Sequence, residues 1–177
     1  NIAFKSDEEF TEYLYIRAQL LTKKNLDQIP SIKGFYGYVS DVELKKRYDN
    51  SHIYFSTERG NGWGIPVMNS IVNGMVPVCI DWGASTEYLK CLDRYLINVD
   101  SLEVVFPTLQ KKTPWYQGQE WASLNSTNIS KCLLNAYNDV KAGSVSQDLV
   151  RIKNDILKNF SFETISCNFD SLIKPIL

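Results

Sequence analysis

The turn TERGNGWGIP, residues 57–66, places three glycines and a proline directly before an apolar helical pattern. Gly60, Gly62 and Gly64 allow the backbone to approach a ligand closely and to adopt positive φ. Pro66 suits the first turn of a helix, where its missing N–H would have no partner. Such a helix start presents free N–H groups and about half a positive charge, so it binds phosphate without Lys or Arg. The turn therefore predicts an anion site, against the alternative of a merely tight strand-to-helix connection.

The segments around this turn alternate between strand and helix patterns. Residues 76–80 are apolar throughout, as expected of a strand that is buried on both faces of a parallel sheet. Ligands of such sheets bind outside the carboxyl ends of the strands, and the glycine turn follows one of these ends. The sequence predicts strands at 1–4, 32–39, 53–56, 76–80 and 95–99, helices at 6–23, 41–50, 65–73 and 85–92, and C-terminal helices at 128–140, 147–158 and 162–173.

This order of elements predicts the α/β class and one doubly wound parallel sheet with a C-terminal helical extension. We expect a single Rossmann-like domain over residues 1–177. Its core βα units occupy residues 1–100, and an irregular segment and the C-terminal helices occupy residues 101–177.

The composition argues against several kinds of partner and site. Nineteen basic and twenty acidic residues give a formal net charge of -1, so no global field attracts nucleic acid. Four widely separated cysteines and a single histidine, His52, argue against a zinc site and against a disulfide framework. No apolar run approaches the ~20 residues of a membrane span. We therefore expect a cytoplasmic chain, or one at the periphery of a membrane, with no metal site.

A longer segment, GNGWGIPVMNSIVNGMVPVCIDWGASTEYL (residues 60–89), resembles the nucleotide-sugar-binding segment of retaining glycosyltransferases with two Rossmann lobes, family four in particular. The preceding GYVSDVELKKRYDNSHIYFST resembles the lead-in of that family, and the later KNFSFETI resembles its C-terminal helix start. The resemblance covers residues 37–87 well and the tail weakly.

The resemblance implies that this chain is the C-terminal, donor-binding lobe of such an enzyme (the GT-B type) and that an N-terminal lobe with the acceptor site lies outside it. The implied activity is transfer of a sugar, with retention, from a nucleotide diphosphate donor such as a UDP- or GDP-sugar. The implied acceptor is a glycan, a lipid or a protein. The family's chemistry needs no metal and no further cofactor.

The resemblance also implies roles for individual positions, with residues 37–39 facing the nucleobase and the turn backbone facing the donor sugar and diphosphate. Arg59, beside the turn, is a candidate for the diphosphate on its charge alone, against the alternative of a solvated loop residue. The donor-binding candidates are Gly37, Tyr38, Val39, Arg59, Gly62, Trp63, Gly64, Ile65, Asn69 and Gly83, and the catalytic candidates are Glu58, Asn61 and Glu87.

The chain departs from the family at its paired glutamates, which fall on Asn61 and Asn69, while Glu58 lies three residues before the first of them. At Asn69 an amide replaces the carboxylate that grips the ribose, so a hydrogen bond of ~1.5–3 kcal/mol becomes one of ~0.5–1.5 kcal/mol. At Asn61 the lost charge lies near the developing oxocarbenium ion and affects the rate more. Three hypotheses stay open: an active transferase that uses Glu58 or Glu87, a chain that binds without catalysing, and a deliberate replacement of the pair.

Two other functions stay open as well. One is a non-catalytic module that binds a nucleotide-sugar or a glycan. The other is a transferase lobe of the exostosin or fucosyltransferase type, against which the ordered GWGIP argues. The aromatics Trp115, Tyr116 and Trp121 are either a stacking platform for a sugar acceptor or the packing of an irregular segment.

Overall fold

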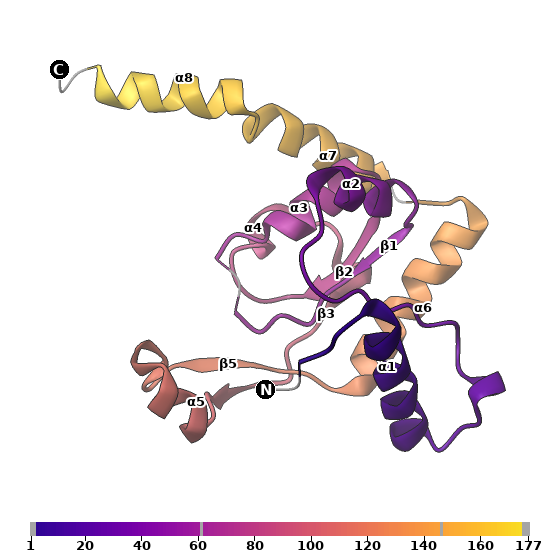
Figure 1. The fold of residues 1–177 in the computed structure, drawn as a ribbon. Helices are drawn as coiled ribbons and strands as arrows, with labels where there is room; N and C mark the ends of the chain where they lie inside the picture. The colour runs from indigo at the N-terminus through magenta and orange to yellow at the C-terminus, as the bar shows by residue number, and fades with distance from the viewer. Residues whose placement is uncertain (1–2, 61, 146, 175–177) are drawn as a thin grey trace. The chain divides into compact units, whose positions relative to one another are not determined.

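The computed structural model describes residues 3–60, 62–145 and 147–174 of the chain (Figure 1). It divides into two compact units, residues 1–44 and residues 45–177. Helix α2 (Asp41–Asp49) runs across the boundary between them. Among the helices of the described residues, none combines the length and the apolar character that crossing a membrane requires.

The 1–44 unit is built on helix α1 (Asp7–Thr22), which is followed by the short 3₁₀ helix η1 (Leu26–Gln28). The Ser6 side chain caps α1 by accepting from the Glu9 N–H at 3.3 Å, and the first turn is acidic, which suits the positive end of the helix dipole. Lys23 ends the helix in the left-handed conformation, with φ 57°. The predicted helix at 6–23 is therefore confirmed.

An extended segment, residues 32–36, lies along α1 and takes its hydrogen bonds from the helix's side chains. The Ile32 N–H donates to the Tyr15 hydroxyl at 2.8 Å, the Gly34 N–H to Thr11 Oγ1 at 2.9 Å, and the Tyr36 N–H to Asp7 Oδ1 at 2.7 Å. The spacings match, because two residues of extended chain rise about 6.6 Å and four residues of helix about 6.0 Å.

The strand predicted at 32–39 is therefore wrong, because its alternate N–H groups bond to α1 and not to a neighbouring strand. The strand predicted at 1–4 falls partly outside the described residues, and Ala3 and Phe4 are not in a strand.

The 45–177 unit contains a parallel sheet of β1 (Ile53–Phe55), β2 (Val76–Ile80) and β3 (Leu96–Ile97), in that order. All five residues of β2 are buried. In the register, Val76 faces Ile53 on β1, and Cys79 faces Leu96 on β3. Pro77 has no N–H to donate, and the ladder with β3 begins only two residues later. β3 is shorter than the strand predicted at 95–99 because Tyr95 belongs to a 3₁₀ helix and because the pairing ends at Ile97, opposite the last residue of β2.

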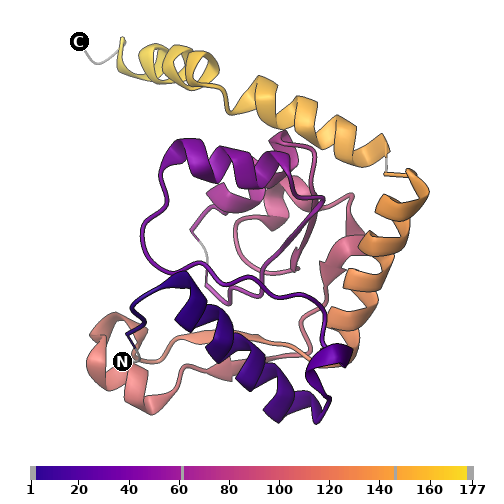
Figure 2. The same ribbon diagram turned by 45° about the vertical axis from the view of Figure 1, so that its right-hand side comes forward.

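Helices cover both faces of this sheet. Helix α3 (Ile65–Val72) packs against β2, and α7 (Gln147–Asn159) packs on α3. Helix α6 (Ser126–Ala142) packs against all three strands, and Figures 1 and 2 show it in orange on the side opposite α3. The core lies between these layers, and its most deeply buried members are Val67, Ile71, Val76, Val78, Leu89, Leu92, Tyr95, Ile97 and Ala136.

The remaining elements are short connections and a C-terminal helix. Helix α4 (Thr86–Leu89) and the 3₁₀ helix η2 (Asp93–Tyr95) lie between β2 and β3. After β3 the chain makes an antiparallel hairpin of β4 (Ser101–Val104) and β5 (Glu120–Ser123), whose connection contains α5 (Pro107–Lys112) and η3 (Pro114–Tyr116). Helix α8 (Phe162–Ile173) begins at the Ser161 cap after α7.

The α/β class is thus confirmed, with a three-stranded parallel sheet, a two-stranded antiparallel sheet and helices at nearly all the predicted positions. The doubly wound arrangement stays a prediction, because β1, β2 and β3 follow one another across the sheet in chain order.

A polar cluster fastens α6 to the end of η2. The Arg94 guanidinium donates to both carboxylate oxygens of Asp139 at 2.7 and 3.1 Å, and the Tyr95 hydroxyl donates to Oδ2 at 2.8 Å. Burial, and then the hydrogen bond to Asp139, raise the pKa of Tyr95 to about 12. Hydrogen bonds from Arg94 and Tyr95 lower the pKa of Asp139. The charged form of Asp139 is therefore the one that joins these two elements.

The close approach of Gly34 to α1 gives a first prediction. A Cβ at Gly34 would lie 2.8 Å from Phe10 Cδ1 and 3.0 Å from the Thr11 backbone nitrogen, so Gly34→Ala pushes the extended segment away from the helix. We expect amide hydrogen exchange at Ile32 and Tyr36 to accelerate about tenfold or more, since overpacking costs ~1–3 kcal/mol. Ser31→Ala, at an exposed neighbouring position, is the control, and unchanged exchange in Gly34→Ala contradicts the close packing.

The Asp139 cluster gives a second prediction, on acid stability. Because the folded-state pKa of Asp139 lies below its unfolded value near 4, its contribution is present above about pH 4 and is lost as the pH falls through the folded pKa. Urea unfolding from pH 6 downward is expected to show a stability difference between wild type and Asp139→Asn that shrinks in acid. A difference that stays constant with pH would show that the charge contributes nothing.

Candidate functional site

The glycine turn connects β1 to α3, so α3 begins at the carboxyl edge of the parallel sheet. Gly64 is the N-cap of α3 in the left-handed conformation, with φ 82° and ψ 40°, and Pro66 lies in the first turn. A glycine N-cap carries no side chain that can accept from the first N–H groups of the helix. No side chain among the described residues caps these N–H groups, and their binding of an external anion stays a prediction.

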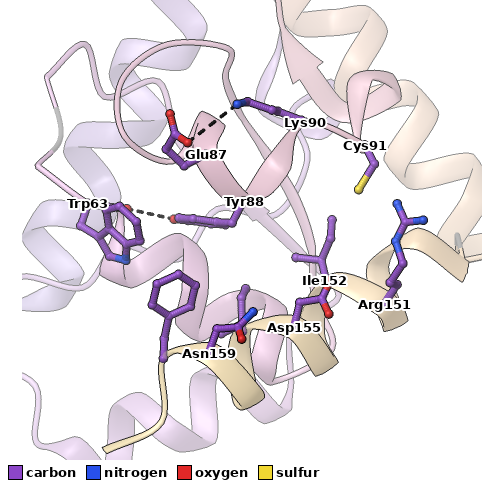
Figure 3. Close-up of a pocket in the computed structure, with 11 residues that line it drawn as sticks. Trp63, Glu87, Tyr88, Lys90, Cys91, Arg151, Ile152, Asp155 and Asn159 are labelled. Carbon is purple, nitrogen blue, oxygen red and sulfur yellow. Dashed lines mark hydrogen bonds and ion pairs between the residues drawn. The ribbon is translucent and has the colours of Figure 1, made fainter. Parts of the chain in front are cut away.

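The Tyr88 hydroxyl fixes the conformation of the turn. It lies 3.0 Å from the Trp63 carbonyl oxygen and 3.1 Å from that of Gly64, so its single proton is shared between two acceptors of the turn (Figure 3). Burial raises the pKa of Tyr88, and the hydroxyl stays a donor at neutral pH. Helix α4, which carries Tyr88, is in this way tied to the start of α3.

Trp63 is also held in place, by aromatic contacts. Its ring centroid lies 5.7 Å from that of Tyr88 and 5.4 Å from that of Phe160, and its Nε1 donates to Met68 Sδ at 2.9 Å. The segment after α7 therefore packs directly on the glycine turn. The turn is bounded by α3, α4 and the chain between α7 and α8.

A pocket of about 870 Å³ lies between α4 and α7, and we call it the α4–α7 pocket (Figure 3). Glu87 belongs to it, but its carboxylate pairs with Lys90 at 3.7 Å, and Arg151 pairs with Asp148 at 3.2 Å. The charges of this pocket are thus largely matched within the protein. Its lining residues are Trp63, Glu87, Tyr88, Lys90, Cys91, Arg151, Ile152, Asp155, Ile156, Asn159 and Phe160.

A second pocket, of about 600 Å³, is formed by the connections that leave the three parallel strands, and we call it the aromatic pocket. The loop after β1 contributes Arg59 and Gly60, and the loop after β2 contributes Trp82 and Gly83. The hairpin after β3 contributes the remainder, which are Val105, Trp115, Tyr116, Gln119, Glu120 and Trp121. The aromatic pocket therefore lies at the carboxyl edge of the sheet, where parallel sheets bind their ligands.

Arg59 is fixed at this pocket by two contacts. Its Nη1 lies 3.5 Å from Glu103 Oε2, and its guanidinium carbon lies 5.1 Å from the ring centroid of Trp121. The Trp121 ring in turn packs edge-on against Phe106 at 5.0 Å. The buried Nε1 of Trp121 has no hydrogen-bond partner among the described residues.

The structure separates the predicted site residues into groups. Arg59 and Gly83 line the aromatic pocket, whereas Trp63 and Glu87 line the α4–α7 pocket. Glu58 lines a narrow cleft with Ser56, Cys79 and Trp82, among others. The other candidates are placed as follows: Gly62 is exposed in the turn, Gly64 is the N-cap, Ile65 and Asn69 are exposed on α3, and Asn61 lies outside the described residues.

Gly37, Tyr38 and Val39 belong to the 1–44 unit and not to the unit that carries the two pockets. Gly37 has φ 101°, and the Tyr38 side chain is almost fully exposed. Their predicted contact with a nucleobase stays a prediction.

The sequence analysis missed Tyr88 and Trp82. Trp82 directly follows the Asp that ends the apolar run of β2, and its place beyond the carboxyl end of a parallel strand was the signal that could have identified it. Tyr88 gave no such signal, because its role depends on the packing of α4 against the turn.

The four cysteines are all free thiols, and Cys79 in the sheet is unreactive at neutral pH. Burial raises the pKa of the Cys79 thiol on β2 to about 12, so it is not a nucleophile at neutral pH. Within residues 3–60, 62–145 and 147–174, no three His, Cys, Asp or Glu side chains are grouped so that they could hold a metal ion.

Comparisons with protein families, with curated proteins and with solved structures give no match to this chain.

The left-handed N-cap gives a third prediction. Gly64→Ala forces a side chain into φ 82°, which costs ~1–2 kcal/mol of unfolding free energy in urea. Gly60→Ala is the control, because a Cβ there meets nothing within 4 Å and its φ is not in the left-handed region, so a change within about 0.5 kcal/mol is expected. Equal losses in the two variants would show that the cap conformation is unimportant.

Proposed function

We propose that residues 45–177 form the nucleotide-sugar-binding part of a retaining glycosyltransferase with two Rossmann lobes. The observation that carries the proposal is a convergence at the carboxyl edge of the sheet. The loop that leads into α3 also lines the aromatic pocket, together with the connections after β2 and β3. In the proposal, the anion site at the start of α3 and this pocket therefore share one loop.

In this proposal the diphosphate binds at the N-terminus of α3 and the sugar lies beside it. The bond between the anomeric carbon and the diphosphate oxygen breaks, and the acceptor oxygen bonds to that carbon on the same face. The acceptor's proton passes to the leaving diphosphate. The first N–H groups of α3 stabilise the charge that develops there, a preorganised contribution that needs no metal.

The proposal also extends the observed fold. It takes the three-stranded parallel sheet as part of a doubly wound lobe, and it places a second lobe outside residues 1–177. The acceptor is a glycan, a lipid or a protein, and the donor is a nucleoside diphosphate sugar such as a UDP- or GDP-sugar.

A non-catalytic nucleotide-sugar or glycan-binding module is the second candidate. It is favoured by the position of Glu87, which pairs with Lys90 and lines a different pocket from Arg59 and Gly83. Asn69, the other described position of the family's glutamate pair, is uncharged and exposed. Donor hydrolysis or transfer by the intact protein, reduced in Glu87→Ala, would identify an enzyme, and no turnover with any donor would identify the module.

Nucleotide binding by the 177-residue chain is the fourth prediction and the test of the proposal. Saturable binding of UDP, GDP or ADP at up to millimolar concentration is expected by calorimetry. Ile65→Glu puts a carboxylate at the first position of α3, on a side chain that is 64% exposed, and should weaken the binding about tenfold, or ~1.4 kcal/mol.

Ile65→Gln is the matched control, with the same length and no charge, and should weaken binding far less. A negative charge at a helix N-terminus stabilises the helix, so Ile65→Glu is expected to stay folded, which a thermal melt of both variants verifies. No saturable binding of any of the three nucleotides would overturn the proposal.

A further inference from the structure

We propose that the aromatic pocket binds a neutral sugar ring, so that this unit carries a carbohydrate subsite of its own. The inference rests on the proposed function in one respect, namely that the bound sugar is part of an acceptor that contacts this unit as well as the second lobe. The subsite itself is argued from the lining residues of the pocket and from their charges.

The pocket is lined by exposed aromatic side chains from the loop after β2 and from η3. Trp115 is 76% exposed, and Trp82 and Tyr116 are each 37% exposed, although large aromatic side chains are usually well buried. A pyranose ring carries apolar C–H groups on one face and hydroxyls around its edge. An aromatic face therefore removes the C–H face from water while the hydroxyls remain free to form hydrogen bonds.

The charges of the pocket favour a neutral ligand. Arg59 is paired with Glu103 at 3.5 Å, and Glu120 is the one carboxylate among the residues that line the pocket. An anion such as a diphosphate would have to compete with Glu103 for Arg59 and would meet the charge of Glu120. Hydroxyl groups carry no such penalty, and Gln119 and Glu120 provide an amide and a carboxylate that can bond to them.

The walls of the pocket are held by contacts that need no ligand. The β4–β5 ladder pairs Val104 with Glu120, and the Val105 N–H donates to the Gln119 carbonyl at 3.0 Å. The Gln110 side chain bonds to the Val105 carbonyl and accepts from the Gly118 N–H at 3.3 Å. A pocket that is already ordered loses little conformational entropy on binding, and its volume of about 600 Å³ is within the range of small-molecule sites.

The fifth prediction is carbohydrate binding by the 177-residue chain, followed by tryptophan fluorescence. Three of the four tryptophans line the pocket, so a bound sugar changes the emission directly. The probes are maltotriose, cellotriose, mannotriose and the trimer of N-acetylglucosamine, each titrated to tens of millimolar. We expect at least one to give a saturable change, and Trp115→Ala to weaken that binding about tenfold, which corresponds to about 1.4 kcal/mol.

Tyr137→Ala is the matched control, because Tyr137 is an exposed aromatic on α6 outside the pocket, and it should leave sugar binding unchanged. Trp115 makes few packing contacts at 76% exposure, so its loss should not unfold the chain, which a thermal melt verifies. No saturable change with any of the four sugars, or equal affinities in wild type and Trp115→Ala, would overturn the inference.

A parallel titration with UDP, GDP and ADP separates this inference from the proposed function. Sugar binding that depends on Trp115, without nucleotide binding, leaves the subsite intact and removes the transferase assignment. Nucleotide binding without sugar binding does the opposite. Nucleotide binding that is itself lost in Trp115→Ala, with no response to sugars, would show that the pocket takes the base and would overturn the inference.

Discussion

Burial of the whole of β2 is the constraint on which the rest of the 45–177 unit depends. A strand with all five residues buried needs a neighbour at each edge and a cover on each face. β1 and β3 are the neighbours, and α3 and α6 are the covers. Because both faces and both edges of this strand are occupied, a ligand can reach it only at its ends.

The longer connections of the chain lie at the carboxyl ends of the parallel strands. At the amino end, the connection from α3 to β2 is short, with Gly74 at φ 83° between them. At the carboxyl end, the chain inserts the glycine turn, the segment from Trp82 to α4, and the β4–β5 hairpin. The Tyr88 hydroxyl bonds to two carbonyls of the turn, and the Gln110 side chain bonds to two backbone groups of the hairpin. Order at this edge is therefore obtained without extending the sheet.

The sequence predicted an element correctly where the residues of that element themselves mark its type and its ends. The continuous apolar run of β2, the Ser6 cap of α1 and the Pro66 start of α3 each contain their own boundary signal, and the structure has these elements where they were predicted. The segment 32–36 is different, because its own residues do not indicate which groups it bonds to. Its aromatic and β-branched residues are typical of a strand, but its hydrogen-bond partners are side chains of α1 spaced four residues apart. The hydrophobic periodicity of the segment gives no sign of this pairing with a helix.

The candidate site shows the same limit. Arg59 and Gly83 follow the ends of β1 and β2 in the sequence, and they line one pocket because the carboxyl ends of parallel strands meet at one edge of the sheet. Position after a strand was insufficient to show that Trp63 and Glu87 line a different pocket from Arg59, since that division depends on how α4 and the α7–α8 segment pack on the turn.

Charge at the start of α3 connects these observations to the departure of the sequence from the family. Helix α3, IPVMNSIV, has no charged side chain, so the positive potential of its N-terminus comes from the backbone alone. In the proposed function, a glutamate at Asn69 would hold a ribose more firmly, but it would also place a negative charge on the second turn of the helix that is proposed to bind the diphosphate. The asparagine loses the first interaction and leaves the potential of the helix uncompensated. In the proposed function, with Arg59 paired to Glu103, that backbone potential is what attracts the diphosphate, and the aromatic pocket is left to a neutral ring.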